Sequence, residues 1–398
     1  MSQKSARSKI QVRPEVNFLS ELYFDDCPNA RLLAEYPSSN NEQTQFKNFS
    51  KFIIHDPFPP PPRELIKFLG PHHLMCGWGK SLAVTSEVAP PQALLEHWKS
   101  IFGEEGCPNW LPYDAGDDSS SYVTLFPHES IRADQQVIEP TVNYAIHSKE
   151  VIEKINCPQA DVLGSAAPPC IVKLSHGYAG LGNFFVRDSE DQSQMQKLVA
   201  DSWPDATLVF NSILEDIVGD FGVQFYLSKD GTITWLGLTE QLFNEKMRWC
   251  GGVFSQKTQQ KMFEPLCQMI EPAGEYLHSV GYFGLVGIDI LQNKSGEFFL
   301  VDVNPRLTGI SPFLMASRIF QRSGLDEGVY QASCRFKGTL DELIHAAEAS
   351  DARVLVLSAF ESGSETDTTQ ESANVTICHL SVTSESQDRN REILKQLL

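Results

Sequence analysis

Two aspartates and an asparagine in the second half of the chain have the types and spacing of a divalent-cation site. Asp289 and Asp302 lie almost equally far from a turn predicted at 293–296, so they should be cross-strand neighbours in a hairpin. Asn304 follows Asp302 by two residues and therefore shares its face of the strand. Two carboxylates and an amide suit Mg²⁺, which keeps coordination positions for water and phosphate oxygens, with Mn²⁺ as an alternative.

Arg306 strengthens this interpretation against a plainer one, in which the two aspartates are ordinary surface residues of a hairpin. It lies two residues beyond Asn304 on the same face, where its fork of donors can reach a phosphoryl or carboxylate oxygen. Apolar residues flank both aspartates. Together these neighbours favour the cation site.

A lysine followed by a glycine-rich segment is the second candidate constellation. Lys173 lies in the strand-like run CIVKL, and residues 175–182 read SHGYAGLG. Glycines leave backbone N–H groups unobstructed and allow positive φ, so this loop can fold over phosphates while Lys173 supplies charge. An ordinary glycine-rich hairpin with a solvated lysine is the alternative, and the predicted cation site favours phosphate binding.

The elements that must position these residues are mostly strands. From residue 170 onward, apolar runs alternate with turn signals such as Asp230-Gly231 and read CIVKL, FFVRD, TLVFNSIL, GVQFYL and TITWLGLTE. A helix is predicted over 262–280, followed by the hairpin strands LVGIDIL and EFFLVDVN and a helix over 312–322. The sheet should be largely antiparallel.

A chain of 398 residues is long enough for two or three structural units. We expect a smaller α/β unit over 1–145, a main unit over 146–335, and a strand and helix segment over 336–398 that completes the fold. That last segment is predicted to hold a helix beyond Gly338 and strands at 354–357 and in VTICHLSV.

Local patterns within the first units predict four further features. Phe52–Ile54 is apolar and predicts a strand, and 94–102 has helical spacing. Residues 107–122 are rich in Pro, Gly, Asp and Ser and predict a surface loop. Ser148 is expected to cap a helix that runs to Ile155.

Composition disfavours several classes of protein. Hydrophobic residues make up 41% and charged residues 21%, as in a globular protein, and no run approaches the ~18 apolar residues of a membrane span. A formal net charge of -19 opposes nonspecific binding of nucleic acid. Nine cysteines without CxxC spacing, and a start without an apolar leader, argue against zinc and favour the cytoplasm.

Three segments, VKLSHGYAGLG, LEDIVGD and GIDILQNKSGEFFLVDVNPRLTG, together resemble the ATP-grasp superfamily over roughly residues 145–325. The resemblance implies an α/β (α+β) ATP-grasp fold, in which two α+β subdomains sandwich ATP, preceded by a pre-ATP-grasp-like α/β domain. It matches Asp289, Asp302 and Asn304 to the metal-binding positions and Arg306 to an arginine that stabilises the reacting acyl phosphate. Lys173 serves both catalysis and nucleotide binding in this comparison.

The same resemblance implies a set of nucleotide-binding residues: Lys149 and Lys173, a phosphate-covering loop with Gly177, Gly180 and Gly182, a linker of Glu215, Asp216, Ile217 and Val218 that reads the adenine edge, Asp220 at the ribose, and Leu291 on the adenine-pocket floor. His176, at the start of that loop, is expected to contact phosphate or substrate, and a solvent-facing loop histidine is the alternative. Lys246 lies, with Glu240 and Arg248, where the superfamily often places phosphate contacts, although a surface loop is the alternative. The short interval from Lys149 to Lys173, and Gly222 at the usual ribose-binding acid position, leave open whether Lys149 and Asp220 contact the nucleotide.

The resemblance further implies an ADP-forming ligase with ATP and Mg²⁺ as cofactors, which makes an amide or peptide bond through an acyl phosphate. The expected partners are a small-molecule carboxylate and an amine, such as an amino acid or peptide, with no nucleic acid and no membrane, and a homodimer stays open. A thiol ligase or carboxylase-type enzyme, or a non-catalytic ATP-binding regulatory module, is the alternative function.

Overall fold

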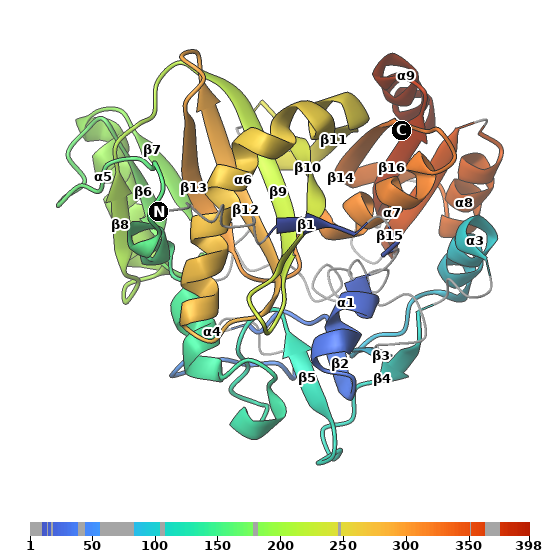
Figure 1. The fold of residues 1–398 in the computed structure, drawn as a ribbon, viewed down its shortest axis with the longest axis horizontal. Helices are drawn as coiled ribbons and strands as arrows, with labels where there is room; N and C mark the ends of the chain where they lie inside the picture. The colour runs from blue at the N-terminus through green and yellow to red at the C-terminus, as the bar shows by residue number, and fades with distance from the viewer. Residues whose placement is uncertain are drawn as a thin grey trace, which may run out of the picture.

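The computed structural model describes residues 10–13, 15–16, 19–38, 44–55, 83–103, 108–177, 182–245, 248–350, 352–362 and 375–398. A nine-stranded sheet organises these residues, with the strand order β13-β12-β9-β10-β11-β14-β16-β15 and with β1 paired to β10 (Figure 1). All of its pairings are antiparallel except that of β1 with β10, as the sequence predicts for the main sheet. Its strands are β1 Ile10–Val12, β9 Ile217–Leu227, β10 Ile233–Phe243, β11 Trp249–Ser255, β12 Gly284–Asn293, β13 Phe298–Asn304, β14 Glu327–Lys337, β15 Arg353–Ser362 and β16 Val375–Ser384.

Local chemistry explains the two hairpins that the sequence predicts. Between β9 and β10, Gly231 has a φ of 83° and the Asp230 side chain accepts a hydrogen bond from the Thr232 N–H at 2.9 Å. Between β12 and β13, the Glu297 N–H donates to Asn293 Oδ1 at 2.9 Å. Both predicted turns are therefore confirmed.

Helices cover the large sheet and complete its cores. Helix α6 (Gln256–Ser279) lies across one face (Figure 1) and buries Leu266 and Ile270 against Phe225 and Ile288 of the central strands. Helix α7 (Ser311–Gln321) follows β13 and is buried over most of its length. The two helices match the predictions, although α6 begins six residues earlier than the predicted Met262.

A second, three-stranded sheet lies beside β13 (Figure 1) and has the order β7-β6-β8. Its antiparallel strands are β6 Cys170–Leu174, β7 Asn183–Val186 and β8 Leu208–Asn211. Helix α5 (Ser189–Ser202) packs on it and is capped by Asp188, whose carboxylate accepts from the Glu190 and Asp191 N–H groups. This small sheet carries Lys173 and the base of the glycine-rich loop.

The third sheet is parallel, with the order β4-β3-β2-β5, and belongs to the first part of the chain. Its strands are β2 Ala30–Leu33, β3 Ala83–Ser86, β4 Trp110–Pro112 and β5 Ser121–Thr124, and α1 (Leu19–Asp26), α3 (Gln92–Phe102), η3 (Ala133–Gln135) and α4 (Pro140–Ile146) accompany them. Helix α3 confirms the helical spacing predicted over 94–102.

Two local predictions are wrong, and a third is confirmed in part. The expected loop over 107–122 contains β4 and the first residues of β5, because Trp110 and Tyr122 supply apolar surface to the parallel sheet. Phe52–Ile54 is not a strand, since the Phe52 N–H donates to Glu129 Oε1 at 3.0 Å instead of to a neighbouring strand. Ser148 caps a helix as predicted, but this is a six-residue 3-10 helix, η4 (Lys149–Lys154), and it ends before the predicted Ile155.

The last part of the chain extends the large sheet. Strands β15 and β16 match the two predicted strands, and α8 (Leu340–Glu348) is the predicted helix, begun by a capping box at Thr339. Strand β14 and helix α9 (Gln387–Leu397) were not predicted, and β14 crosses the predicted boundary at 335/336. The division into three units stays a prediction.

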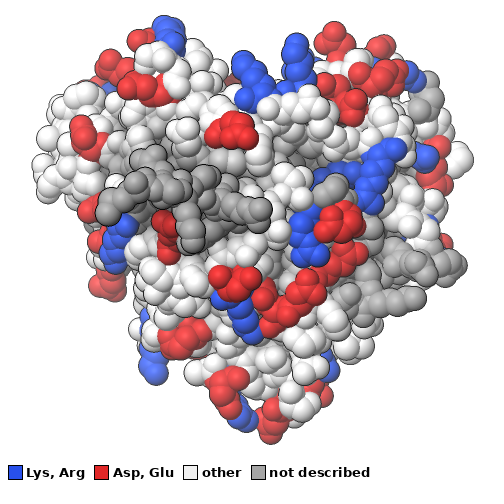
Figure 2. Space-filling model, in the orientation of Figure 1, with Lys and Arg blue, Asp and Glu red and all other residues white. Residues whose placement is uncertain are grey.

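Three further observations concern the cysteines, the helices and the surface charge of the described residues. Their seven cysteines are free thiols. None of the helices in the described ranges has both the length and the apolar character needed to cross a bilayer. Acidic and basic side chains are interspersed on the face shown in Figure 2.

Glu35 provides a test of burial in the parallel-sheet unit. Its side chain is buried and accepts a hydrogen bond from the Glu87 N–H at 2.7 Å, and burial raises the pKa of Glu35 to about 7. Because this pKa exceeds the value of an unfolded glutamate, the protein loses stability as the pH rises through about 7. Glu35→Gln keeps the acceptor oxygen but does not ionise. Its free energy of unfolding, measured relative to that of the wild type, should therefore rise by about 3 kcal/mol from pH 4.5 to pH 8.5.

Urea denaturation of both proteins at several pH values measures this difference. A difference in the free energy of unfolding that stays constant over the whole range would contradict the assignment.

Candidate functional site

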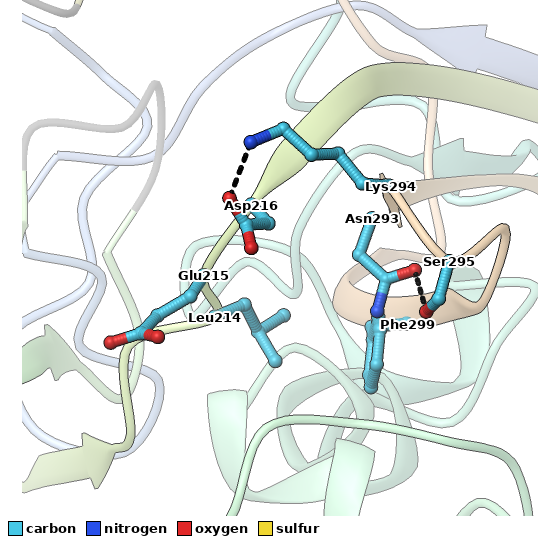
Figure 3. Close-up of a pocket in the computed structure, with 7 residues that line it drawn as sticks. All are labelled: Leu214, Glu215, Asp216, Asn293, Lys294, Ser295 and Phe299. Atoms are coloured by element: carbon cyan, nitrogen blue, oxygen red, sulfur yellow. Dashed lines mark hydrogen bonds and ion pairs between the residues drawn. The ribbon is translucent and has the colours of Figure 1, made fainter.

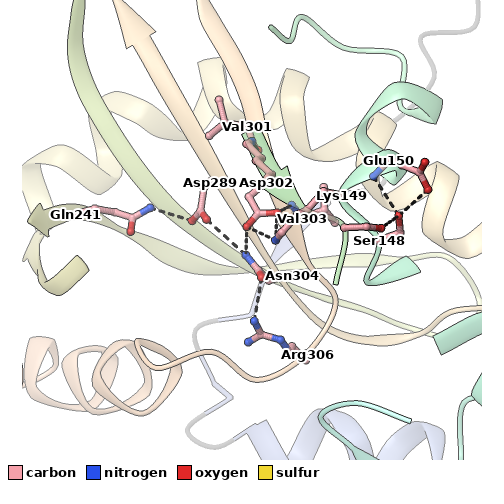
Figure 4. A network of polar contacts seen from close by, with 12 residues as sticks. Ser148, Lys149, Glu150, Gln241, Asp289, Val301, Asp302, Val303, Asn304 and Arg306 are labelled. Atoms are coloured by element: carbon pink, nitrogen blue, oxygen red, sulfur yellow. Dashed lines mark hydrogen bonds and ion pairs between the residues drawn. The ribbon is translucent and has the colours of Figure 1, made fainter. Parts of the chain in front are cut away.

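The acid pair of the last hairpin is the centre of the candidate site. Asp289 on β12 and Asp302 on β13 are direct partners in the antiparallel register, which confirms their predicted juxtaposition (Figure 4). Asn304 lies on the same face, with its Nδ2 3.4 Å from Asp289 Oδ2 and 3.5 Å from Asp302 Oδ2. On the turn side of the acid pair the register shifts, because Ile290 pairs with Leu300, and Val301 is left unpaired in the ladder as a β-bulge.

The two carboxyl groups have opposite electrostatic environments. Burial, then repulsion from Asp302, raises the pKa of Asp289 to about 7, although Gln241 Nε2 donates a hydrogen bond to its Oδ1 at 2.9 Å. Burial by itself would raise the pKa of Asp302 as well, but Lys149 and Lys173 outweigh burial and lower it. Asp302 is therefore an anion at neutral pH, and a further positive charge beside Asp289 would favour its ionisation.

Lys149 balances Asp302 directly. Its Nζ donates to both Asp302 oxygens at 2.6 Å, and its side chain is only 9% exposed. The 3-10 helix η4 brings it there, because the Ser148 side chain caps the Glu150 N–H and the Lys149 N–H donates to the Ser175 carbonyl oxygen at 2.8 Å. A residue predicted for the nucleotide thus contacts a residue predicted for the metal.

Lys173 approaches the hairpin from the small sheet. Its Nζ donates to the carbonyl oxygen of Val301, at the bulge, over 2.8 Å. Burial lowers its pKa, and the charge of Asp302 opposes that shift. Two lysines from separate elements therefore lie beside one acid pair. A site that binds both a cation and phosphate, as the sequence predicts, needs such a combination.

Arg306 lies at the opposite side of Asn304 (Figure 4). Its Nη2 donates to Asn304 Oδ1 at 3.0 Å and its Nη1 donates to the Leu307 carbonyl oxygen at 3.1 Å. The guanidinium carbon lies 4.9 Å from the centre of the Phe126 ring, which belongs to the first part of the chain. The guanidinium is thus held at the edge of the acid-bearing face.

The base of the glycine-rich loop rests on the parallel-sheet unit. The His176 ring stacks on Tyr144 with 3.9 Å between ring centres, its Nε2 is 3.1 Å from the Tyr144 carbonyl oxygen, and burial lowers its pKa to about 4. Gly177 forms an isolated bridge with His55. At Gly182 a Cβ would lie 2.8 Å from Leu174 Cδ1, so this position requires glycine. Gly180, like Lys246, lies outside the described residues.

A cavity of about 490 Å³ opens at the far end of the hairpin (Figure 3). Two of the four predicted linker residues line it, and Lys294 Nζ forms an ion pair with Asp216 Oδ1 at 2.6 Å across its rim. The lining residues are Leu214, Glu215, Asp216, Asn293, Lys294, Ser295 and Phe299.

The remaining predicted nucleotide residues lie between the cavity and the acid pair. Ile217 and Val218 begin β9 and are exposed. Asp220 is the register partner of Leu291 in the next strand, and burial raises the pKa of Asp220 to about 6. One face of β9 and β12 therefore leads from the cavity to Asp289.

Sequence reasoning missed several residues of the site and overestimated others. Gln241 was not predicted. It lies two residues after Thr239 on β10, so the period of two along a strand places both side chains on one face of the sheet. Glu240 is exposed and accepts from Thr258 Oγ1, and Arg248 lies in the turn before β11. Neither contacts the acid pair in a described interaction. Phe126 and Tyr144 carried no signal in the sequence.

The donor set fits one hard cation. Within the described residues no group of three His, Cys, Asp or Glu side chains could hold a metal. The predicted set contains two acids and one amide, and rotation of the Asn304 amide would exchange its nitrogen for its oxygen on the acid side. Buried, adjacent carboxylates with one raised pKa are chemically suited to Mg²⁺ or Mn²⁺.

Comparison with known proteins finds similarity to ligases. Residues 149–304 match the family model described as L-aspartate–L-methionine ligase, ATP grasp. A butirosin acyl-carrier protein–L-glutamate ligase from Niallia circulans is 20% identical over 267 residues. That match covers 56% of this chain and 61% of the relative, so the chain spans about three fifths of the length of the curated relative.

Solved structures show the fold. The N5-carboxyaminoimidazole synthetase of Staphylococcus aureus complexed with ADP has a TM-score of 0.50 and 11% identity, covering 79% of this chain and 90% of that chain. A second structure of the synthetase from the same organism also has a TM-score of 0.50, with 10% identity over 84% and 94% of the two chains. These comparisons confirm the expected ATP-grasp fold.

Breaking the buried ion pair should destabilise the protein much more than breaking an exposed one. In Lys149→Met the carboxylate of Asp302 loses its closest cation, and we expect the free energy of unfolding to fall by about 3 kcal/mol. This value is at the lower end of the range for a broken buried ion pair, because Lys173 still lies near Asp302. Lys294→Met is the matched control, because both side chains of the Lys294–Asp216 pair are about two thirds exposed. It should cost less than ~1 kcal/mol.

Chemical denaturation of the two variants and the wild type at pH 7 measures these costs. Equal losses in the two variants would mean that the Lys149–Asp302 pair is not buried as described.

Proposed function

We propose that this chain, whose residues 149–304 form an ATP-grasp domain of the ligase type, is an ADP-forming ligase that joins a carboxylate to an amine. One observation carries the proposal: the acid pair Asp289 and Asp302 lies beside Lys149 and Lys173, which come from two other elements. Positioned acids and lysines are what phosphoryl transfer requires, because that reaction depends on holding a triphosphate and its divalent ions in place.

Asp289, Asp302 and the oxygen of Asn304 would hold Mg²⁺, with Mn²⁺ as the alternative. All three offer hard oxygen ligands, and the raised pKa of Asp289 supports a site that gains from an added positive charge. When bound, the ion would neutralise phosphate charge and leave positions open for phosphate oxygens.

The two lysines would bind the phosphates of ATP. Lys149 Nζ lies on Asp302, and Lys173 Nζ lies on the carbonyl oxygen of Val301 next to it. A rotamer change in either long side chain can transfer its ammonium from these oxygens to a phosphate oxygen without moving the backbone. The loop from Gly177 to Gly182 would cover the same phosphates, and His176 anchors its first residues on Tyr144.

The nucleoside would lie along the face that leads to the cavity. Leu291 and Asp220 are register partners there, and Glu215 and Asp216 line the cavity at its end. We assign the base to the side of Leu291 and the backbone of residues 215–218, and the ribose to Asp220. This order leaves the triphosphate next to the acid pair.

The proposed reaction has two steps. An oxygen of the substrate carboxylate attacks the γ-phosphorus of ATP, the bond from that phosphorus to the β–γ bridging oxygen breaks, and ADP leaves with an acyl phosphate formed. The amine nitrogen then attacks the acyl carbon, inorganic phosphate leaves, and the amine loses a proton. Arg306, whose planar fork lies next to Asn304, would stabilise the charge that develops on the transferred group and on the acyl oxygen.

The names of the similar proteins suggest the substrate class. The matching family model is described as a ligase of L-aspartate and L-methionine, and the curated relative is a ligase of L-glutamate to an acyl-carrier protein. An amino acid is one reactant in both. We therefore assign an amino acid to at least one of the two substrate positions of this chain.

A substrate screen tests the proposal. The full chain is incubated with ATP, Mg²⁺ and pairs of amino acids, and ADP release and product mass are measured. Hydroxylamine in place of the amine traps the acyl phosphate as a hydroxamate. Amine-dependent ADP release with an amide product is expected, whereas release that requires a thiol or bicarbonate, or nucleotide binding without ADP, would overturn the proposal in favour of a thiol ligase, a carboxylase-type enzyme or a non-catalytic module.

Asp302→Asn should lower kcat for ADP formation by at least ~10²-fold, because the neutral amide cannot balance the cations that hold the triphosphate. Glu297→Gln is the control, because Glu297 lies in the exposed turn of the same hairpin. Steady-state assays of both variants, with circular dichroism to verify folding, measure the effect. Near-normal ADP formation by folded Asp302→Asn would defeat the assignment of the acid pair.

A further inference from the structure

The contacts of Arg306 divide into local and long-range ones. Its two hydrogen bonds go to Asn304 and Leu307, which are neighbours on the same segment and move with it. The Phe126 ring is different, because it comes from the first part of the chain and is separated from Arg306 by 180 positions. The Arg306 Nε is buried and has no hydrogen-bond partner within the described residues. The orientation of the guanidinium therefore depends strongly on the ring.

The ring itself has a defined position. Phe126 is 2% exposed and follows directly on β5 of the parallel sheet. Its ring centre lies 5.8 Å from that of Tyr36 and 4.6 Å from that of His147. Tyr36 follows β2, and His147 is the C-cap of α4. The ring is therefore part of a packed aromatic group outside the hairpin and cannot follow Arg306 if the hairpin segment shifts.

The contact has the geometry of a cation–π interaction. A guanidinium carbon 4.9 Å from a ring centre is within the ~6 Å over which the ring quadrupole attracts a cation, and desolvation strengthens that attraction. His147, which touches the same ring, does not compete as a charge, because burial and the nearby Arg306 hold its pKa well below the ordinary value. Of these two neighbours of the ring, the guanidinium is therefore the one that carries a charge.

We propose that Phe126 is a positioning residue for the ligase reaction, which holds the Arg306 guanidinium in the orientation that meets the transferred phosphoryl group. This inference rests on the proposed function. It gives the parallel-sheet unit a direct part in the chemistry, because a ring next to that sheet lies against the arginine. A fork-shaped donor is effective only in one plane, so a small rotation of Arg306 costs rate without loss of nucleotide binding.

Fluorination of the ring separates this role from simple packing. Phenylalanine with one, two or three fluorines, introduced at position 126 of the full chain, keeps nearly the same shape while fluorine withdraws electron density from the ring face. We expect kcat for ADP formation to fall stepwise with each fluorine, to roughly a tenth for the trifluoro ring, and the KM for ATP to stay within about twofold. The same series at Phe46, a buried ring that contacts Tyr113 and His128, is the control and should leave kcat unchanged.

A second measurement reads the contact without catalysis. The ¹⁵N-correlated NMR signal of the Arg306 Nε–H, assigned by its absence in Arg306→Lys, should be displaced by the ring current, and Phe126→Leu should abolish that displacement. A kcat that does not depend on fluorination at position 126 in an active enzyme, or an Arg306 signal that is the same in Phe126→Leu, would overturn the inference. Failure of the proposed function would look different, because the wild type would then release no ADP with any substrate pair. In that case the NMR measurement would still decide whether the ring positions Arg306.

Discussion

Repulsion between two neighbouring carboxylates is the constraint on which the rest of this structure depends. Asp289 and Asp302 face each other across two strands in a setting where burial penalises both charges. Such a pair persists in a folded protein only if cations and donors surround it. Lys149 supplies one charge and Lys173 another, so the hairpin, the 3-10 helix and the small sheet have to meet at one place.

The backbone serves this meeting as much as the side chains do. The β-bulge at Val301 leaves a carbonyl oxygen outside the regular ladder, and Lys173 donates to it. The small sheet is thereby tied to the hairpin next to the acids. In the proposed function the same two lysines would bind phosphate oxygens, so one set of groups would both balance the acids and hold a triphosphate.

The first part of the chain closes the site from a third direction. Tyr144 stacks on His176 at the base of the loop, and Phe126 lies over the guanidinium of Arg306. One contact is a ring stack and the other a cation–π contact, and in both a buried or half-buried ring limits where its partner can lie. The parallel sheet thus supports both the loop that would cover the phosphates and the arginine that would meet the transferred group.

The sequence by itself determined the arrangements that are local to a strand or a hairpin. Alternation along strands and the turn at 293–296 predict that Asp289, Asp302 and Asn304 share a face, because a strand has a period of two and a hairpin reflects its register about the turn. Only the tertiary structure decided that Lys149 pairs with Asp302 across 153 positions, that Gln241 joins Asp289, and that Phe126 meets Arg306. It also decided against a strand at Phe52–Ile54, whose backbone bonds to Glu129. Periodicity reports only on neighbours along the chain, whereas contacts between distant segments are set by how separately formed cores pack together.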